Sequence, residues 1–187
     1  MRRTAKIFRT PVVLLILICS ILFGFIADII LTGIDRLIYP EDYHELVSKY
    51  AAENTVPEEL VFAIIKVESN FQSDAKSHAG AIGLMQMIPS TFEWLASRRG
   101  EIAHPAMLYD PEVNIKYGTY YLQYLYLKFG TWERVLIAYN WGEGKFMSFI
   151  EEHGYTDGDY NSIPVSETRA YVQKVLHHWQ KYNELYE

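Results

Sequence analysis

One carboxylic acid, Glu68, stands in an unusual setting in the sequence. It follows a largely apolar run from Leu60 to Val67, at the point where a helix of that composition would end. Burial, the negative end of the helix dipole and any apolar cover would each raise the pKa of its carboxyl. A carboxylic acid that stays protonated near neutral pH is what a general acid for glycosidic cleavage requires. Position alone leaves a second interpretation open, a solvated carboxylate with no chemical role.

Several residues after Glu68 could line a binding site for a sugar substrate of such a general acid. Gly80 and Gly83 allow positive φ and a close approach of the backbone to a ligand. The amide of Gln86 can both donate and accept hydrogen bonds, which suits sugar hydroxyls. Each of these residues fits an ordinary loop equally well, and Asn140 fits a helix C-cap. Met85 is expected to be cleft wall or core filler.

The other acidic residues and the histidines favour structural roles. Asp110 is expected to cap a helix, and Asp74 and Glu143 are expected to be solvated loop acids. The six histidines show no metal-ligand spacing, because the adjacent His177 and His178 would point to different helix faces. No Ser/His/Asp or phosphate-binding signature stands out. We therefore expect no metal site and no cofactor.

The aromatic residues are also expected to be structural when each is taken singly. Trp94, Trp132 and Trp179 are predicted to be core residues rather than platforms for sugar rings. The chain has 15 tyrosines, so a core position is the default expectation for Tyr139 and Tyr171.

The elements that must position these residues are helices. Pro57 and Glu58 suit a helix first turn, Asp110 suits an N-cap, and Gly130 suits a helix end. No alternating strand pattern of useful length is present. The sequence predicts an all-α fold with irregular segments at 70–88 and 153–164, and with helices over 41–53, 57–67, 89–98, 111–129, 132–139 and 166–182.

The N-terminal segment predicts a membrane anchor. Basic residues precede an uncharged run from Val12 to Ala27, and extension to Ile34 makes the run long enough to cross a bilayer. We expect residues 1–36 to form a cytoplasmic basic flank and a single transmembrane signal anchor, with residues 37–187 outside the cytoplasm. A cleaved signal peptide is the alternative, although the residues before Asp28 make a poor cleavage site.

Composition narrows the class of protein further. Half of the 187 residues are hydrophobic and 15% are aromatic, which is too much for a disordered chain. The net charge of −6 argues against a general nucleic-acid binder. The one cysteine, Cys19, lies in the apolar N-terminal run, so no disulfide within the chain is expected.

Four ordered motifs give the candidate residues a common context. The set closely resembles the lytic transglycosylases of the soluble-lytic (SLT, family 1) type, which are lysozyme-like, and the resemblance covers about residues 41–182. The motifs are Glu68-Ser69-Asn70-Phe71, then Gly80-Ala81-Ile82-Gly83-Leu84-Met85-Gln86-Met87-Ile88-Pro89, then Ala138-Tyr139-Asn140-Trp141-Gly142, and Glu167-Thr168-Arg169-Ala170-Tyr171-Val172. Between them, Asp110-Pro111-Glu112-Val113-Asn114-Ile115 and Gly118 also fit.

The resemblance implies a role for each matching position. Glu68 matches the single catalytic acid/base, Ser69 the polar residue beside it, and Tyr171 a tyrosine whose hydroxyl reaches the catalytic carboxyl. The remaining matches imply glycan-binding positions: Gly83, Leu84, Met85 and Gln86 in a cleft-lining loop, and Tyr139 and Asn140 beside the catalytic acid.

The function implied by the resemblance is that of a bacterial peptidoglycan lytic transglycosylase, a lyase. It would cleave the β-1,4 bond between N-acetylmuramic acid and N-acetylglucosamine and leave 1,6-anhydromuramoyl ends. Its expected partners are peptidoglycan strands and, through the N-terminal helix, the cell membrane; no protein partner is indicated. Two alternatives stay open: a goose-type-lysozyme-like hydrolase, and a non-catalytic peptidoglycan-binding scaffold. A role as an accessory of a secretion, conjugation or sporulation machine is also allowed.

Overall fold

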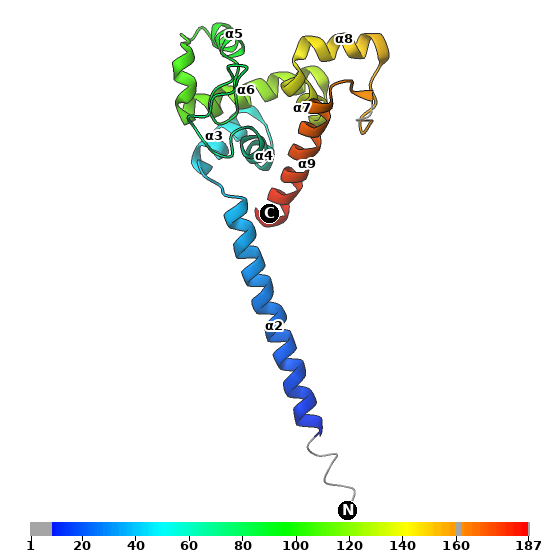
Figure 1. The fold of residues 1–187 in the computed structure, drawn as a ribbon. Coiled ribbons are helices and arrows are strands. Elements are labelled where there is room, and N and C mark those ends of the chain that lie inside the picture. Colours follow the sequence, from blue (N-terminus) through cyan, green and yellow to red (C-terminus); the bar gives the residue numbers. More distant parts are fainter. Residues whose placement is uncertain (1–8, 160–161, 187) are drawn as a thin grey trace, which may run out of the picture. The chain divides into compact units, whose positions relative to one another are not determined.

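The computed structural model describes residues 9–159 and 162–186, and its regular elements are helical (Figure 1). Two isolated β-bridges, Lys76 with Ile82 and Ile82 with Met87, lie in the segment between α4 and α5. The all-α prediction is therefore confirmed. The elements are α2 Arg9–Ile38, α3 His44–Asn54, α4 Glu58–Glu68, α5 Pro89–Arg99, η1 Pro105–Tyr109, α6 Pro111–Phe129, α7 Trp132–Trp141, α8 Glu143–His153 and α9 Ser166–Tyr186.

The chain divides into two compact units, one ending at Pro40 and the other running from Glu41 to Glu187. The first unit contains α2, whose segment Pro11–Ile38 is 28 residues long and apolar enough to cross a membrane. At about 1.5 Å per residue this segment is about 42 Å long, against roughly 30 Å for a bilayer core. A signal sequence would meet the same test of length and composition. The helix continues two residues past the boundary at 36/37 that the sequence suggested.

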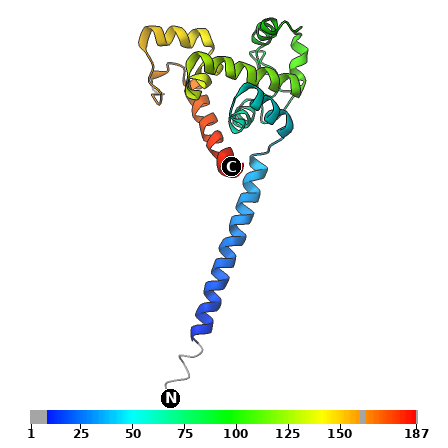
Figure 2. The ribbon, with the colours of Figure 1, turned by 180° about the vertical axis from the view of Figure 1, so that it is seen from behind.

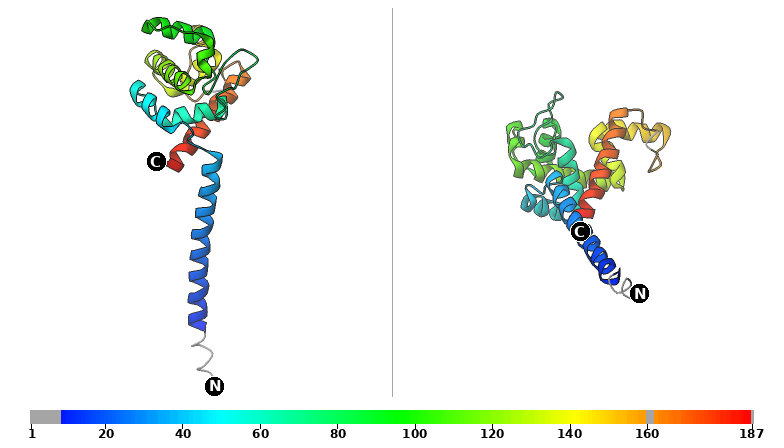
Figure 3. Two further views of the ribbon diagram at one scale, coloured as in Figure 1. Left: turned by 90° about the vertical axis from the view of Figure 1, so that its left-hand side faces the viewer. Right: turned by 60° about the horizontal axis from the view of Figure 1, so that its bottom comes forward.

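The second unit is organised around two buried helices, α4 and α6. Helix α4 packs most extensively against α9, and α3 packs against both α4 and α6. Helix α6 runs across the unit from α5 and η1 to α7, as Figure 2 shows from behind and Figure 3 from two further sides. Residues Leu60 to Ile65 of α4 are all buried. This burial agrees with the largely apolar run that precedes Glu68 in the sequence.

Helix ends follow local sequence signals in most cases. Asp110 caps α6, since its Oδ1 accepts hydrogen bonds from the backbone N–H groups of Glu112 and Val113. Gly130 ends the same helix with a φ of 82°, a conformation that glycine adopts at low cost. Thr131 precedes α7 but makes no side-chain cap bond.

The sequence interpretation missed one helix. Residues Glu143–His153 form α8, which follows α7 after the single residue Gly142 and buries Phe146. The loop that the sequence predicts at 153–164 does follow the end of α8 at His153. The miss matters because α8 carries Glu143, which is described below.

Candidate active site

Helix α4 places Glu68 at its last turn, where the buried helix meets a cleft. The helix ends at Glu68, and the backbone N–H of Ser69 closes it by bonding the carbonyl of Ile65. Glu68 itself is partly buried. It opens on a cleft of about 260 Å³ between α4, α7 and α9, lined by Val67, Glu68, Asn140, Glu167, Ala170, Tyr171 and Lys174.

The cleft changes the acidity of Glu68. Burial raises the pKa of its carboxyl to about 7, while an interaction with the Tyr171 hydroxyl acts in the opposite direction. The position at the helix C-terminus also disfavours the charged form. Glu68 is thus poised to give and to take a proton near neutral pH.

Two tyrosines border Glu68. Burial raises the pKa of both Tyr139 and Tyr171 well above the ordinary value, and the negative charge of Glu68 raises both further. Each hydroxyl therefore keeps its proton. The Tyr139 hydroxyl donates it to the carbonyl of Met85 at 2.6 Å. The Tyr171 hydroxyl is buried, and among the described residues no group stands at both the distance and the angle of a regular hydrogen bond to it. It can therefore turn to donate its proton to the Glu68 carboxylate when Glu68 is ionised.

Asn140 and Ser69 lie beside Glu68 and are held differently. The Oδ1 atom of Asn140 accepts a hydrogen bond from the Thr168 hydroxyl at 2.8 Å, which leaves the amide NH₂ outside that bond. The Ser69 hydroxyl donates to the carbonyl of Ile65 at 3.2 Å, so here it contacts the backbone of α4 rather than the carboxyl of Glu68. The roles suggested for both residues stay predictions.

The loop that carries Gln86 folds into a hairpin-like turn, which contacts Tyr139 through the carbonyl of Met85. Ile82 and Met87 exchange backbone hydrogen bonds of 3.0 Å in both directions. Gln86 adopts a φ of 48°, and its Nε2 donates to the carbonyls of Gly83 and Ala75. The side chain therefore stabilises the turn through its nitrogen.

A buried residue of α6, Asn114, fixes the loop in place. Its Nδ2 donates to the carbonyls of Ile82 and Leu108, and its Oδ1 accepts from the N–H of Met85. The sequence interpretation assigned Asn114 no role. Asn114 lies four residues before Gly118 and eight before Leu122, so a polar amide shares a helix face with core positions, and this spacing is the signal that could have revealed it.

Gly83 and Met85 are explained by close packing around Asn114. A Cβ on Gly83, whose φ is 80°, would lie 2.2 Å from Nδ2 of Asn114 and 2.3 Å from the carbonyl oxygen of Leu108. Met85 is fully buried, and its sulfur lies 2.2 Å from where a Cβ on Gly118 would stand. Met85 is thus core filler, and it presents its backbone carbonyl to Tyr139.

Two residues lie where the sequence interpretation did not place them. Glu143 is not a solvated loop acid: it begins α8, accepts a hydrogen bond from the Tyr124 hydroxyl at 2.8 Å and pairs with Lys128. Trp94 is not a core residue, because 37% of it is exposed. Phe92, Leu95 and Ala96 already form the buried face of α5, and Trp94 projects away from that face.

Among the residues that the structure describes, no group of three or more His, Cys, Asp or Glu side chains gathers to hold a metal ion. The cleft offers the Glu68 carboxyl with its raised pKa, the Tyr171 hydroxyl and the Asn140 amide, and the charged side chains of Glu167 and Lys174 also line it.

The helical unit has a lysozyme-like fold, and its Glu68 carboxyl closes a core helix and faces a cleft. The Transglycosylase SLT domain model matches residues 45–161, and the chain belongs to this family. The matched segment contains Glu68, the Gln86 loop, Tyr139 and Asn140, and it ends before α9, which carries Tyr171.

The chain is similar to enzymes from several bacteria. It is 37% identical over 145 residues to the soluble lytic murein transglycosylase of Escherichia coli K12, covering 74% of this chain and 22% of the relative. It is 34% identical over 165 residues to the membrane-bound lytic murein transglycosylase C of Actinobacillus pleuropneumoniae serotype 5b, covering 75% of this chain and 45% of the relative.

A solved structure aligns over 78% of the chain. It is an inactive mutant of the lytic transglycosylase Slt from Pseudomonas aeruginosa in which glutamine replaces a glutamate, with a TM-score of 0.72 and 32% identity. The alignment covers 24% of that protein. The chain therefore spans between about a quarter and a half of the length of these relatives.

Proposed function

We propose that this protein is a peptidoglycan lytic transglycosylase in which Glu68 acts as general acid and then as general base. The observation that carries the proposal is the Glu68 carboxyl, buried at the end of α4 in a cleft with its pKa raised to about 7. The SLT family membership and the lytic murein transglycosylase relatives support the substrate class. The inactivity of a glutamate-to-glutamine mutant of a relative supports the need for one carboxyl.

The proposed reaction begins with protonation. Protonated Glu68 gives its proton to the glycosidic oxygen between N-acetylmuramic acid and N-acetylglucosamine, and the bond from that oxygen to the muramoyl C1 breaks. The carbonyl oxygen of the substrate's own N-acetyl group stabilises the positive charge at C1. The substrate thus supplies what a second carboxylate supplies in most glycosidases.

The second half of the reaction closes a ring. Glu68, now a carboxylate, takes the proton from the 6-hydroxyl of the muramoyl residue, and O6 bonds to C1. The products are a 1,6-anhydromuramoyl end and a free 4-hydroxyl on N-acetylglucosamine, and no water is consumed. Tyr171 stabilises the carboxylate stage, in keeping with its lowering of the Glu68 pKa. Asn140 and Gln86 are proposed to hold the sugar.

We also propose that α2 anchors the chain in the cell membrane as a single span, with the SLT unit on the wall side. The support is the length and apolar surface of Pro11–Ile38, the basic residues that precede it, and the similarity to membrane-bound relatives. Protease protection in sealed vesicles tests the orientation. An SLT unit protected in right-side-out cells but cleaved in inverted vesicles would contradict it.

The test of the reaction uses the full chain in detergent and purified peptidoglycan. Wild-type protein and Glu68→Gln are incubated with the wall, and the soluble fragments are identified by mass spectrometry. We expect anhydro-ended muropeptides from the wild type and none from the variant. Reducing muramoyl ends would turn the assignment to a hydrolase. Binding to the wall without any fragments from wild-type protein would favour the scaffold interpretation.

A further inference from the structure

Thr168, in the first turn of α9, is a buried polar residue that bonds a side chain of the candidate site. Only 1% of Thr168 is exposed. Its hydroxyl donates a hydrogen bond of 2.8 Å to the Oδ1 of Asn140, which stands one residue before the end of α7. Asn140 lines the Glu68 cleft, whereas Thr168 is not among the lining residues. Thr168 therefore reaches the cleft through Asn140.

This hydrogen bond sets the direction of the Asn140 amide. A primary amide has an oxygen that accepts and a nitrogen that donates, on opposite sides of the same carbon. Because the Thr168 hydroxyl donates to Oδ1, the oxygen of Asn140 is turned toward α9. Among the described residues, no acceptor is bonded to the Nδ2 atom on the other side. Asn140 therefore offers N–H donors, rather than an acceptor, to a molecule in the cleft.

The start of α9 holds Thr168 in place. The backbone N–H of Arg169 donates to the carbonyl of Val165 at 3.1 Å, and the Arg169 guanidinium donates to the carbonyl of Ile163. Two bonds from one residue thus fix the backbone beside Thr168. A β-branched side chain also has few rotamers in a helix, so the Thr168 hydroxyl has little freedom to turn away from Asn140.

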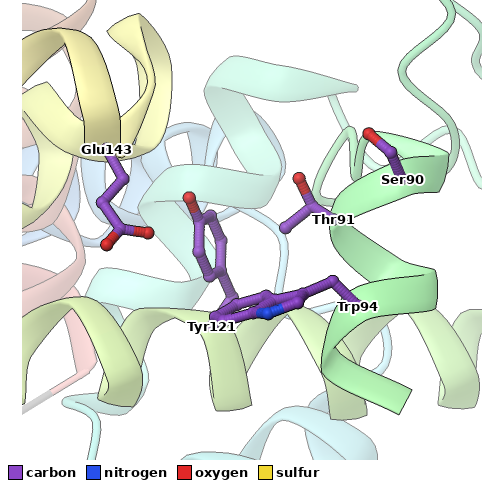
Figure 4. A pocket seen from close by; sticks show the side chains of 5 residues that line it. All are labelled: Ser90, Thr91, Trp94, Tyr121 and Glu143. Atoms are coloured by element: carbon purple, nitrogen blue, oxygen red, sulfur yellow. The ribbon is translucent and has the colours of Figure 1, made fainter. Parts of the chain in front are cut away.

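The backbone around Asn140 is held separately, at the corner between α7 and α8. Glu143 begins α8 and accepts a hydrogen bond of 2.8 Å from the hydroxyl of Tyr124 on α6. Figure 4 shows Glu143 extending from α8 on the side of a pocket where Tyr121 rises from α6. The corner is therefore tied to α6 without Thr168, and Thr168 adds the direction of the Asn140 amide.

We propose that Thr168 is a positioning residue, which turns the Asn140 amide so that its NH₂ donates to an acceptor oxygen of the substrate beside Glu68. The inference rests on the proposed function, because the substrate is the one proposed there. Without the Thr168 hydroxyl, Asn140 can present either its oxygen or its nitrogen to the cleft. Only the molecules that present the nitrogen then bind the substrate productively.

The test is a double-mutant cycle on the full chain in detergent. Initial rates of muropeptide release from soluble peptidoglycan strands at low substrate concentration report kcat/KM. Thr168→Val removes the hydroxyl and should lower kcat/KM by about 5- to 10-fold, the effect of one hydrogen bond. Thr168→Ser keeps the hydroxyl and should stay within about 2-fold of the wild type. In protein that carries Asn140→Ala, Thr168→Val should cause no further loss.

The matched control is Thr119→Val, which removes the hydroxyl of another buried threonine bonded to an asparagine. The Thr119 hydroxyl accepts a hydrogen bond of 2.9 Å from the Nδ2 of Asn54, between α6 and α3. Like Thr168→Val, this change should lower the free energy of unfolding, but it should leave kcat/KM within about 2-fold of the wild type. Thr168→Val should also leave the pH–rate profile in place, because Thr168 bonds Asn140 and not Glu68.

An unchanged kcat/KM in Thr168→Val would overturn the proposal. A loss of the same size in protein that carries Asn140→Ala would also overturn it, since Thr168 would then act independently of Asn140. A faster Thr168→Val enzyme would show that the substrate needs the Asn140 oxygen instead. If Thr168→Val does not fold, Thr168→Ala replaces it in the cycle. Wild-type protein that releases no fragments refutes the proposed function and this inference together, whereas release with a failed cycle refutes the positioning role alone.

Discussion

Two carboxylates in the same unit have opposite environments. Glu68 lies in the cleft between α4 and α9, and burial raises its pKa to about 7. Glu101, after α5, accepts hydrogen bonds of 2.8 Å from Lys116, Arg99 and Tyr117, and these contacts lower its pKa to about 2, with Lys116 the largest cause.

The difference in pKa means that the Glu68 carboxyl is suited to proton transfer, whereas the Glu101 carboxylate is suited to a structural role. Glu101 is surrounded by donors and holds α5 to α6 as a permanent anion. Glu68 shares its cleft with the Tyr171 hydroxyl and the Asn140 amide, which can hydrogen-bond to either of its protonation states, and with the charged side chains of Glu167 and Lys174. A fully satisfied carboxylate cannot release a proton near neutral pH, because it holds none. The following predictions test this contrast, from the largest expected effect to the smallest.

Replacing Glu68 by Gln should reduce the rate of muropeptide release by about 10³-fold or more, since general acid–base catalysis typically contributes 10²–10⁴-fold. The matched change Glu101→Gln should leave the rate within about 2-fold. Initial rates on purified peptidoglycan measure both. Equal losses of rate in Glu68→Gln and Glu101→Gln would show that the difference in pKa between the two carboxyls is unrelated to activity.

The same Glu68→Gln change should stabilise the fold at alkaline pH. The folded-state pKa of Glu68 lies above the unfolded value of 4.5, so its stabilising contribution is present at low pH and is lost as pH rises from about 4.5 through about 7. Above pH 7 the ionised carboxyl costs roughly 3 kcal/mol by the usual 1.4 kcal/mol per pKa unit.

Chemical unfolding at pH 5 and at pH 8 checks this prediction. The free energy of unfolding of Glu68→Gln should exceed that of the wild type by about 2–3 kcal/mol at pH 8 and by under about 1 kcal/mol at pH 5. A difference between the two proteins that is the same at both pH values would contradict a raised Glu68 pKa.

Replacing Tyr171 by Phe should slow the reaction by about 10-fold. It should also move the alkaline limb of the pH–rate profile to higher pH. The direction follows from the Tyr171 hydroxyl, which lowers the Glu68 pKa, so its removal raises that pKa. The control Tyr117→Phe removes a hydroxyl bonded to Glu101 instead and should leave the limb in place. A shift to lower pH in Tyr171→Phe would exclude the proposed positioning role.

The smallest effect is expected for the stability of Glu101→Gln. Its partners and its own carboxyl are considerably exposed, and exposed ion pairs contribute about 1 kcal/mol or less after screening by solvent. Thermal unfolding at low and high salt measures the loss, which should shrink as salt rises. A salt-independent loss would mean that Glu101 acts through packing.

Local signals were enough to predict most of the fold. Asp110 and Gly130 mark the ends of α6 because caps depend on a few neighbouring residues. Helix α8 was missed because its glycine-flanked start resembles a loop, although Phe146, Phe149 and Ile150 have helical spacing. The misreading of Glu143 followed from this, since its partners Tyr124 and Lys128 come from another helix.

Less of the candidate site than of the fold could be predicted from the sequence. The position of Glu68 at the end of an apolar helix could be derived from the residues, but its proximity to Tyr171, 103 residues later in the printed sequence, could only be implied by family resemblance. The assignment of Trp94 to the core overlooked that Phe92, Leu95 and Ala96 already fill the buried face of α5. Contacts between distant residues depend on packing that no local pattern records.

The three hydrogen bonds of Asn114 have a consequence for the binding of the proposed glycan substrate. A wall polymer loses much conformational freedom when it enters a cleft, and a receptor that also had to order its own loop would add to that loss. Here one side-chain amide joins Ile82, Met85 and Leu108 during folding, before any sugar arrives. The loop that carries Gln86 is therefore fixed in advance, so the entropy lost on binding the proposed substrate would fall on the substrate.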